Sequence, residues 1–238
     1  MKSLVVAPRF CGPPASANGG YIAGLFASIA SGTVAVRLLK PPPLAVELQV
    51  HEAAGGSLEL RHGDEVVALA SPATLDVVPP AAPTYLEALS ASTHHTDPAA
   101  NPFPTCFVCG PQRARGDGLR IFAGPLPREP RTVAAPWTPD ASLDQGDGKV
   151  RAEFMWAALD CPGYFAASAD SRLMLLGEFT AHVDRRVHVD ERCIIVAWSI
   201  ASSGRKHVVG SALYDDNGEP CARARAVWIE PRAPAEKS

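Results

Sequence analysis

Asp160 is the strongest candidate for a catalytic residue in this chain, because its carboxylate lies inside a long apolar run over residues 150–165. Burying a charged carboxylate without a partner costs free energy, so a carboxylate at this position is expected to have a structural or catalytic role. Burial also raises the pKa of a carboxyl group, which makes it a better proton acceptor near neutral pH. The alternative is that Asp160 bonds a neighbouring backbone group where Pro162 and Gly163 interrupt a helix. The adjacent thiol of Cys161 would be a nucleophile only with a histidine beside it.

A second chemical feature is the sequence Asn18-Gly19-Gly20-Tyr21, which opens an apolar segment extending to Ala30. Backbone N–H groups at a helix N-terminus favour negative charge. Such donors suit the oxyanion that forms when water attacks a carbonyl group. The competing interpretation is that the two glycines only allow a helix start to pack tightly beneath a sheet.

Two cysteines, Cys106 and Cys109, form a CxxC pair with His94 and His95 upstream. Thiolates and imidazoles hold zinc in tetrahedral sites, so the two cysteines are weak candidates for metal binding. A second CxxC is missing, and the sequence therefore favours a tight turn closed by Gly110. We expect neither a metal ion nor another cofactor.

The elements that must position these residues follow the same order in both halves of the chain. The first half predicts a short strand over 4–7, an enclosed apolar helix over 19–30 and period-two strands over 33–38, 44–51, 57–61 and 65–78. The second half predicts short strands over 119–123, 131–135 and 149–152, a helix over 154–168, and long strands over 174–183, 187–202, 206–214 and 220–230. Runs of strands without interleaved helices argue against a parallel doubly wound sheet.

Turn chemistry and strand periodicity refine this picture. The sequence Asp-Asp-Asn-Gly over 215–218 predicts a hairpin turn, because glycine accepts the positive φ of a tight loop. Over 222–226, alanines alternate with arginines, so the small residues share one face of a strand and the arginines the other. A proline-bounded linker over 81–104, with a short helix at 84–90, separates the halves.

Three passages of the sequence resemble tandem hotdog-fold proteins of the acyl-CoA thioesterase superfamily. Residues 18–23 (Asn-Gly-Gly-Tyr-Ile-Ala) are similar to the family's His-Gly-Gly-Tyr-Leu-Ala helix start, and residues 158–160 (Ala-Leu-Asp) to its Ser-Leu-Asp-His segment. The strands over 179–228 resemble the C-terminal hotdog hairpins. The chain departs from the pattern where Asn18 and Cys161 replace histidines, and it lacks the family's C-terminal glutamine.

The resemblance implies an α+β double hotdog, in which each of two units wraps a long antiparallel sheet around one central helix. The units would span residues 1–80 and 105–238. It also implies an acyl-CoA thioester hydrolase with Asp160 as base, the Gly20 and Tyr21 amides holding the oxyanion, and Thr180 positioning water. The alternative is a hotdog protein that binds acyl-CoA or another hydrophobic ligand without catalysis.

The remaining substrate contacts are expected at both ends of the chain. Asn18 and Gly19 would line the acyl site, while three arginines on neighbouring strands would meet CoA phosphates: Arg205, Arg223 and Arg225. The competing interpretation of these arginines is a solvated basic face.

Composition narrows the class of protein. The chain has 238 residues, 47% of them hydrophobic, and a net charge of −3, which argues against a general nucleic-acid binder. Neither a signal peptide nor a membrane span is expected, because the apolar stretches are too short. Six irregularly spaced cysteines predict a cytoplasmic protein with reduced thiols. Pairing of whole chains into a homodimer through their sheet faces stays open, since no residue pattern in the sequence supports it.

Overall fold

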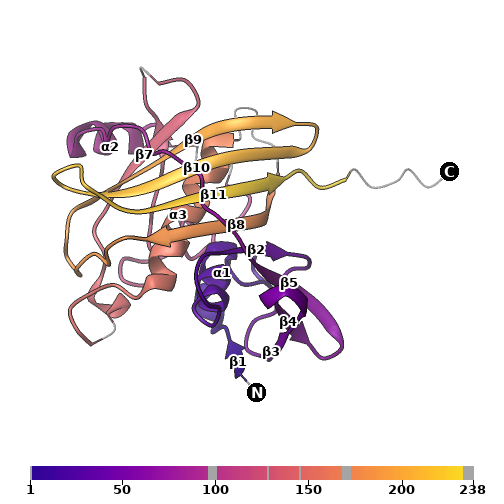
Figure 1. The fold of residues 1–238 in the computed structure, drawn as a ribbon. Helices are drawn as coiled ribbons and strands as arrows, with labels where there is room; N and C mark the ends of the chain where they lie inside the picture. The colour runs from indigo at the N-terminus through magenta and orange to yellow at the C-terminus, as the bar shows by residue number, and fades with distance from the viewer. Residues whose placement is uncertain (1, 96–100, 128, 145, 168–172, 233–238) are drawn as a thin grey trace.

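A computed structural model describes residues 2–95, 101–127, 129–144, 146–167 and 173–232 of the chain. Within these ranges the protein is an α+β structure with one antiparallel sheet of eleven strands and three α-helices (Figure 1). The helices are α1 (Gly19–Ala27), α2 (Tyr85–Ser92) and α3 (Ala152–Ala167). The predicted helices at 19–30, 84–90 and 154–168 are confirmed within a few residues, although position 168 lies outside the described ranges.

The sheet is built from two runs of strands that follow the two halves of the chain. The first half contributes β1 (Lys2–Val5), β2 (Val34–Leu38), β3 (Glu47–Glu52), β4 (Leu58–His62) and β5 (Glu65–Pro72). The second half contributes β6 (Gly124–Pro125), β7 (Thr132–Trp137), β8 (Leu175–Val183), β9 (Cys193–Ser203), β10 (Lys206–Asp215) and β11 (Pro220–Ile229). Their spatial order is β1-β3-β4-β5-β2-β8-β11-β10-β9-β7-β6. The halves therefore meet where β2 pairs with β8, with Val36 opposite Phe179.

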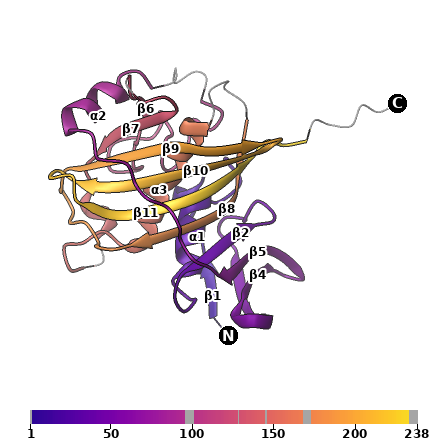
Figure 2. The same cartoon turned by 45° about the horizontal axis from the view of Figure 1, so that its top comes forward.

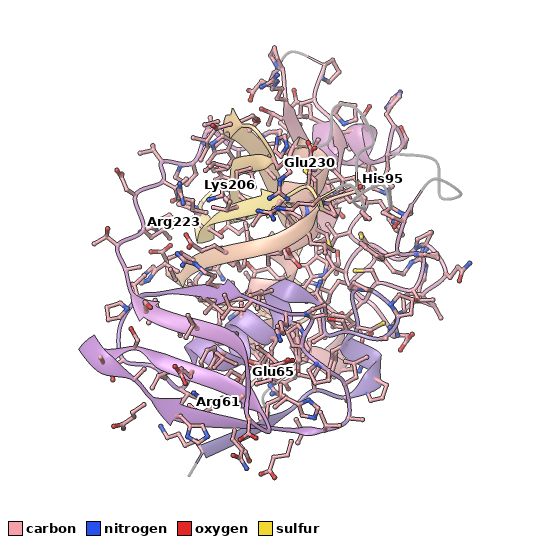
Figure 3. The ribbon with its side chains drawn as sticks, turned by 90° about the vertical axis from the view of Figure 1, so that its right-hand side faces the viewer. Arg61, Glu65, His95, Lys206, Arg223 and Glu230 are labelled. Carbon is pink, nitrogen blue, oxygen red and sulfur yellow. The ribbon has the colours of Figure 1, made fainter. Side chains whose placement is uncertain are left out.

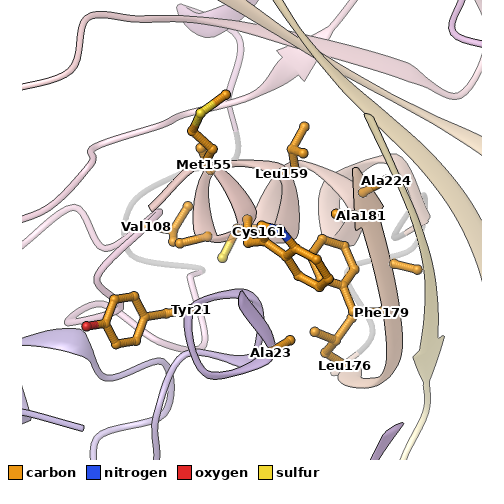
Figure 4. Packing of buried hydrophobic residues seen from close by; sticks show 14 of the residues in the cluster. Tyr21, Ala23, Val108, Met155, Leu159, Cys161, Leu176, Phe179, Ala181 and Ala224 are labelled. Atoms are coloured by element: carbon orange, nitrogen blue, oxygen red, sulfur yellow. The ribbon is translucent and has the colours of Figure 1, made fainter. Parts of the chain in front are cut away.

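Helices α1 and α3 pack against each other within the curve of this sheet (Figures 1 and 4). Their closest approach requires glycine on α1. A Cβ atom on Gly24 would lie 2.8 Å from the Cα of Glu153 and 2.8 Å from the Cβ of Trp156. A Cβ atom on Gly20 would lie 2.5 Å from the Cβ of Asp160. Close packing of the two helices brings the polar start of α1 against the middle of α3.

The linker carries more structure than a simple connection. Helix α2, capped by Thr84, packs its Ala88 and Ala91 onto the outer face of β7, β9 and β10. Upstream, residues 73–84 cross the outer face of the second half's strands (Figures 1 and 2), where the Tyr214 hydroxyl donates to the Pro80 carbonyl over 2.6 Å. The linker thus covers apolar surface that the central helices do not reach.

Two short strand predictions in the second half are wrong. Residues 119–123 form no strand, because their backbone N–H groups bond the loop that carries the CxxC pair: Leu119 donates to the Phe107 carbonyl and Ile121 to the Val108 carbonyl. Residues 149–152 make only isolated bridges before α3 begins at Ala152. Leu119, Ile121, Ala123 and Val150 in these segments are buried. The hydrophobic pattern therefore correctly indicated burial, but the buried residues belong to loops and not to strands.

Helix α3 continues through Pro162 and Gly163, so the predicted interruption at these residues is wrong. Proline removes one intrahelical hydrogen bond, and the carbonyl of Leu159 nearby accepts a bond of 2.8 Å from the hydroxyl of Ser211 on β10. The predicted hairpin turn is confirmed, since the Gly218 N–H donates to the Asp215 carbonyl and Gly218 has a φ of 82°. None of the described helices is long and apolar enough to cross a membrane.

The close approach of α1 and α3 predicts the outcome of a glycine substitution. Gly24→Ala should lower the free energy of unfolding by about 2 kcal/mol, because overpacking against backbone atoms lies near the upper end of about 1–3 kcal/mol and the better helix former returns about 1 kcal/mol. Gly19→Ala is the matched control, since its added methyl group would meet the movable end of the Leu176 side chain. Urea unfolding measures both variants, and equal stabilities would contradict the packing argument.

Candidate active site

A cavity of about 650 Å³ opens where the two halves meet. Most of its lining is apolar. The polar and sulfur-bearing side chains among the lining residues are Ser16, Asn18, Lys40, Asn101, Cys106, Cys109, Asp160, Cys161, Tyr164, Met174, Arg205, Trp228 and Glu230. An apolar cavity with a few converging polar groups is the usual form of a small-molecule site.

Asp160 lies at this cavity on α3, with 2% of its surface exposed. One carboxylate oxygen, Oδ2, accepts a hydrogen bond of 2.9 Å from the side-chain amide of Asn18 and one of 3.0 Å from the backbone N–H of Gly20. The other oxygen, Oδ1, is buried and accepts no hydrogen bond from any residue that the structure describes. Two donors from α1 therefore fix the carboxylate and leave one oxygen for a ligand.

The environment of Asp160 raises the pKa of its carboxyl group to about 7. Desolvation by burial is the largest cause, and the charge of Cys106 raises the pKa further. The hydrogen bonds from Gly20 and Asn18 act in the opposite direction, because they favour the charged form. A carboxyl group in this state can exchange a proton near neutral pH.

The backbone amides predicted to hold an oxyanion are already engaged. The Gly20 N–H donates to Asp160, and the Tyr21 N–H donates over 2.9 Å to the Oδ1 atom of Asn18, which caps α1. Neither Gly20 nor Tyr21 lines the cavity, whereas Asn18 and Gly19 do. The helix start thus holds the Asp160 carboxylate in place, and these two N–H groups are not free to bind a substrate oxygen.

Three other predicted site residues lie on the outer face of the sheet. On β8, Phe179 and Ala181 belong to the inner core, so Thr180 between them points the opposite way. Arg223 and Arg225 alternate on β11 with alanines of the same core, as the period-two pattern predicts. None of these three residues lines the cavity, so the structure does not bring them to the site.

The outer-face arginine Arg223 has a local partner: its guanidinium donates over 2.6 Å to Asp184. Arg205 differs, because it lines the cavity at the end of β10, where its guanidinium donates over 2.7 Å to the Glu230 carbonyl. Figure 3 shows the neighbours Lys206 and Glu230 together at that end of the strands, with Arg223 further along the sheet. Of the three predicted arginines, the structure brings only Arg205 to the cavity.

Sequence reasoning missed Trp228, which lines the cavity from β11. Its ring packs edge-on against Tyr164, with ring centroids 5.5 Å apart. The indole Nε1 is buried and donates to no group in the described part of the chain. Because a buried indole N–H normally finds an acceptor, Trp228 is a candidate donor to a ligand. The sequence gave no indication of this role, because Trp228 follows the ordinary alternation of buried residues along β11.

Sequence reasoning also missed that Cys161 joins the CxxC pair. The sulfur atoms of Cys106, Cys109 and Cys161 lie within 4.8 Å of one another, and all three residues line the cavity. Figure 4 shows Cys161 on the side of α3 that faces α1 and the loop of Val108. Two histidines that folding could have brought to this thiol have other partners, since His182 pairs with Asp184 and His207 with Glu230, and neither lines the cavity. The structure therefore gives a nucleophilic role for Cys161 no support from these two residues.

No family model matches the sequence, and no curated protein matches it. Solved structures do match its fold. A TesB protein from Mycobacterium avium subsp. paratuberculosis is 16% identical with a TM-score of 0.61, and the alignment covers 97% of this chain and 92% of that one. A candidate thioesterase from Novosphingobium aromaticivorans is 11% identical with a TM-score of 0.64, over 97% and 95% of the two chains.

The acyl-CoA thioesterase II TesB2 from Mycobacterium marinum gives the same picture, with 13% identity and a TM-score of 0.60 over 98% of this chain and 93% of that one. Sequence identities this low support a shared fold but not a shared activity. The resemblance drawn from three short sequence passages is confirmed at that level: the chain is similar in structure to TesB-type thioesterases and shares their hotdog fold.

Proposed function

We propose that this protein hydrolyses acyl-CoA or a related thioester in the cavity between its halves, with Asp160 as the base. The observation that carries the proposal is the asymmetric carboxylate of Asp160. One oxygen is fixed by two donors from α1, and the other is buried without a donor among the described residues. That arrangement suits a carboxylate that must hold and deprotonate a water molecule.

The proposed reaction uses groups that line one cavity. Water held at Asp160 Oδ1 forms a bond to the thioester carbonyl carbon, and its proton passes to the carboxylate. The carbon–sulfur bond then breaks, and the leaving thiolate takes up a proton. Trp228 replaces the helix-start amides as the donor for the developing oxyanion, because this residue lines the same cavity and its buried indole N–H has no acceptor in the described part of the chain.

The apolar lining would accept the acyl chain, and Arg205 at the mouth would contact a phosphate of CoA. Its guanidinium uses Nη1 on the Glu230 carbonyl, which leaves other donors for a phosphate oxygen. The two units of the proposed double hotdog are residues 1–80 and 105–238, joined by the linker over 81–104. In this division α1 comes from one unit and α3 from the other, and the site forms only where both meet.

Replacing the base should abolish turnover. Asp160→Asn keeps an oxygen for the Asn18 and Gly20 donors but cannot accept a proton, so thiol release from acyl-CoA should fall by about 100-fold or more. The variant should remain as stable as the wild type, because no buried charge is left unpaired. Asp76→Asn, at an exposed position, is the matched control and should retain full activity.

The assay measures free thiol over a panel of acyl chain lengths, alongside thermal unfolding. Undiminished turnover in Asp160→Asn would remove this residue from the mechanism. Thermal stabilisation of the wild type by acyl-CoA without thiol release would identify a binding protein in place of a hydrolase.

The contact between Asn18 and Asp160 should be specific in its chemistry. Asn18→Asp keeps the acceptor for the Tyr21 N–H but sets a second carboxylate against Asp160, so the free energy of unfolding should fall by about 3 kcal/mol. In the double variant Asn18→Asp, Asp160→Asn, the amide at position 160 can donate to the carboxylate at position 18. The double variant should therefore recover most of the lost stability, but it should remain inactive. Asn217→Asp, in an exposed turn, should change little. If the Asn18→Asp variant were as stable as the wild type in urea unfolding, the pairing of Asn18 with Asp160 would be refuted.

The oxyanion assignment is tested by removing one N–H group. Trp228→Phe keeps an aromatic ring in the cavity and should lower kcat by about 100-fold with little change in KM, because the lost bond forms only as charge develops. Trp198→Phe on β9 is the matched control, since Trp198 packs on the outer face near α2. Equal losses in both variants, or none in Trp228→Phe, would exclude this role.

A further inference from the structure

Three cysteines that are distant in the sequence converge at one wall of the cavity. Cys106 and Cys109 lie on one loop, and Cys161 follows Asp160 on α3. Their sulfur atoms lie within 4.8 Å of one another, and those of Cys106 and Cys161 are 3.7 Å apart. At most 6% of each residue is exposed. Burial of three thiols at such distances calls for a chemical explanation.

The loop is shaped so that two of the sulfur atoms point the same way. The Gly110 N–H donates to the Cys106 carbonyl over 2.9 Å. A Cβ atom at Gly110 would come within 2.4 Å of that carbonyl oxygen and 2.6 Å of the Cys106 nitrogen, so only glycine closes this turn. The tight turn that the sequence predicts at Cys106–Gly110 therefore exists, and it presents Cys106 and Cys109 to α3.

Amide donors surround the sulfur atoms. The side-chain amide of Asn18 lies 4.0 Å from the sulfur of Cys106 and 3.9 Å from that of Cys161, within hydrogen-bond range for sulfur. The amide of Asn101 lies 3.9 Å from the sulfur of Cys109 and donates to that residue's carbonyl over 3.0 Å. Donors of this kind stabilise negative charge on thiolate ligands.

The thiols also stabilise one another as a thiolate. Hydrogen bonds from Cys109 and Cys161 hold the pKa of Cys106 well below its ordinary value, and the backbone N–H groups of Cys109 and Val108 lower it further. The same contacts with Cys106 raise the pKa values of Cys109 and Cys161.

We propose that Cys106, Cys109 and Cys161 bind a zinc ion, with the fourth coordination position open to the cavity. In a tetrahedral site with Zn–S bonds of about 2.3 Å, neighbouring sulfur atoms lie about 3.8 Å apart, which matches the separation of Cys106 and Cys161. A disulfide would use two of the sulfur atoms and leave the third, with its amide donor, unexplained.

The fourth position would take water or a small thiolate, because all three cysteines line the cavity. The zinc site stands apart from the proposed hydrolysis, since it rests on the sulfur geometry and is tested without any substrate.

The test is a titration of the reduced, metal-free full-length protein with Co²⁺ under anaerobic conditions. We expect one Co²⁺ per chain, thiolate-to-cobalt charge-transfer absorption, the visible bands of tetrahedral cobalt, and loss of both signals when Zn²⁺ is added. Cys161→Ser and Cys106→Ser should each weaken Co²⁺ binding by at least about 10-fold. Cys193→Ser, a buried cysteine outside the cluster, is the matched control and should bind Co²⁺ like the wild type.

Three results would overturn the proposal. The first is a wild type without the charge-transfer band, which decides the question even where a serine variant fails to fold. The second is a Cys161→Ser variant that binds Co²⁺ as tightly as the wild type. The third is an intact mass of the protein as purified, before reduction, that is two hydrogens below the reduced value, with no bound metal and with the difference lost in Cys161→Ser; it would assign the cluster to disulfide formation.

Discussion

The hydrogen bonds from the start of α1 to the Asp160 carboxylate are the interaction on which the rest of the structure depends. A carboxylate with 2% exposure is costly to bury, and two donors from the other half of the chain offset that cost. Because Gly20 donates through its backbone, α1 must approach α3 closely enough that a side chain at this position would collide with Asp160. One polar contact thus fixes the helix spacing, and the sheet that joins at β2 and β8 encloses both helices.

This contact also engages the two backbone donors, on Gly20 and Tyr21, that the sequence predicted to hold an oxyanion. The N-terminal N–H groups of α1 satisfy Asp160 and the capping oxygen of Asn18, so their positive end neutralises a protein group before any ligand arrives. Among the buried side-chain atoms of the described cavity-lining residues, one oxygen of Asp160 and the indole nitrogen of Trp228 have no hydrogen-bond partner, the first an acceptor and the second a donor. These two groups are therefore candidates to bind a ligand.

The sequence allowed the elements to be predicted better than the site. Periodicity and turn residues located the helices, the long strands and the Asp215–Gly218 hairpin, because these signals are local. Arg223 and Arg225 alternate with core alanines along β11, so the sequence already predicted that they point outward. The predicted contacts with CoA phosphates did not take this into account. The third thiol of the cluster could not be predicted, since Cys106 and Cys161 are 55 positions apart and only the packing of α3 against the loop brings them together. Trp228 was equally hidden, because a missing acceptor is visible only in three dimensions.

Asn18 links the carboxylate and the thiol cluster physically. Its amide nitrogen has two N–H bonds but three acceptors within range: Asp160 Oδ2 at 2.9 Å, and the sulfur atoms of Cys161 and Cys106 at 3.9 and 4.0 Å. Negative charge on the carboxylate and on the thiolates therefore competes for the same donors, in a place where water does not screen it. A cation among the sulfur atoms relieves this competition, because it takes over the thiolate charge and leaves the amide to Asp160. Asparagine at this position suits that arrangement, since one neutral amide serves the Asp160 carboxylate, the helix cap and the cluster together.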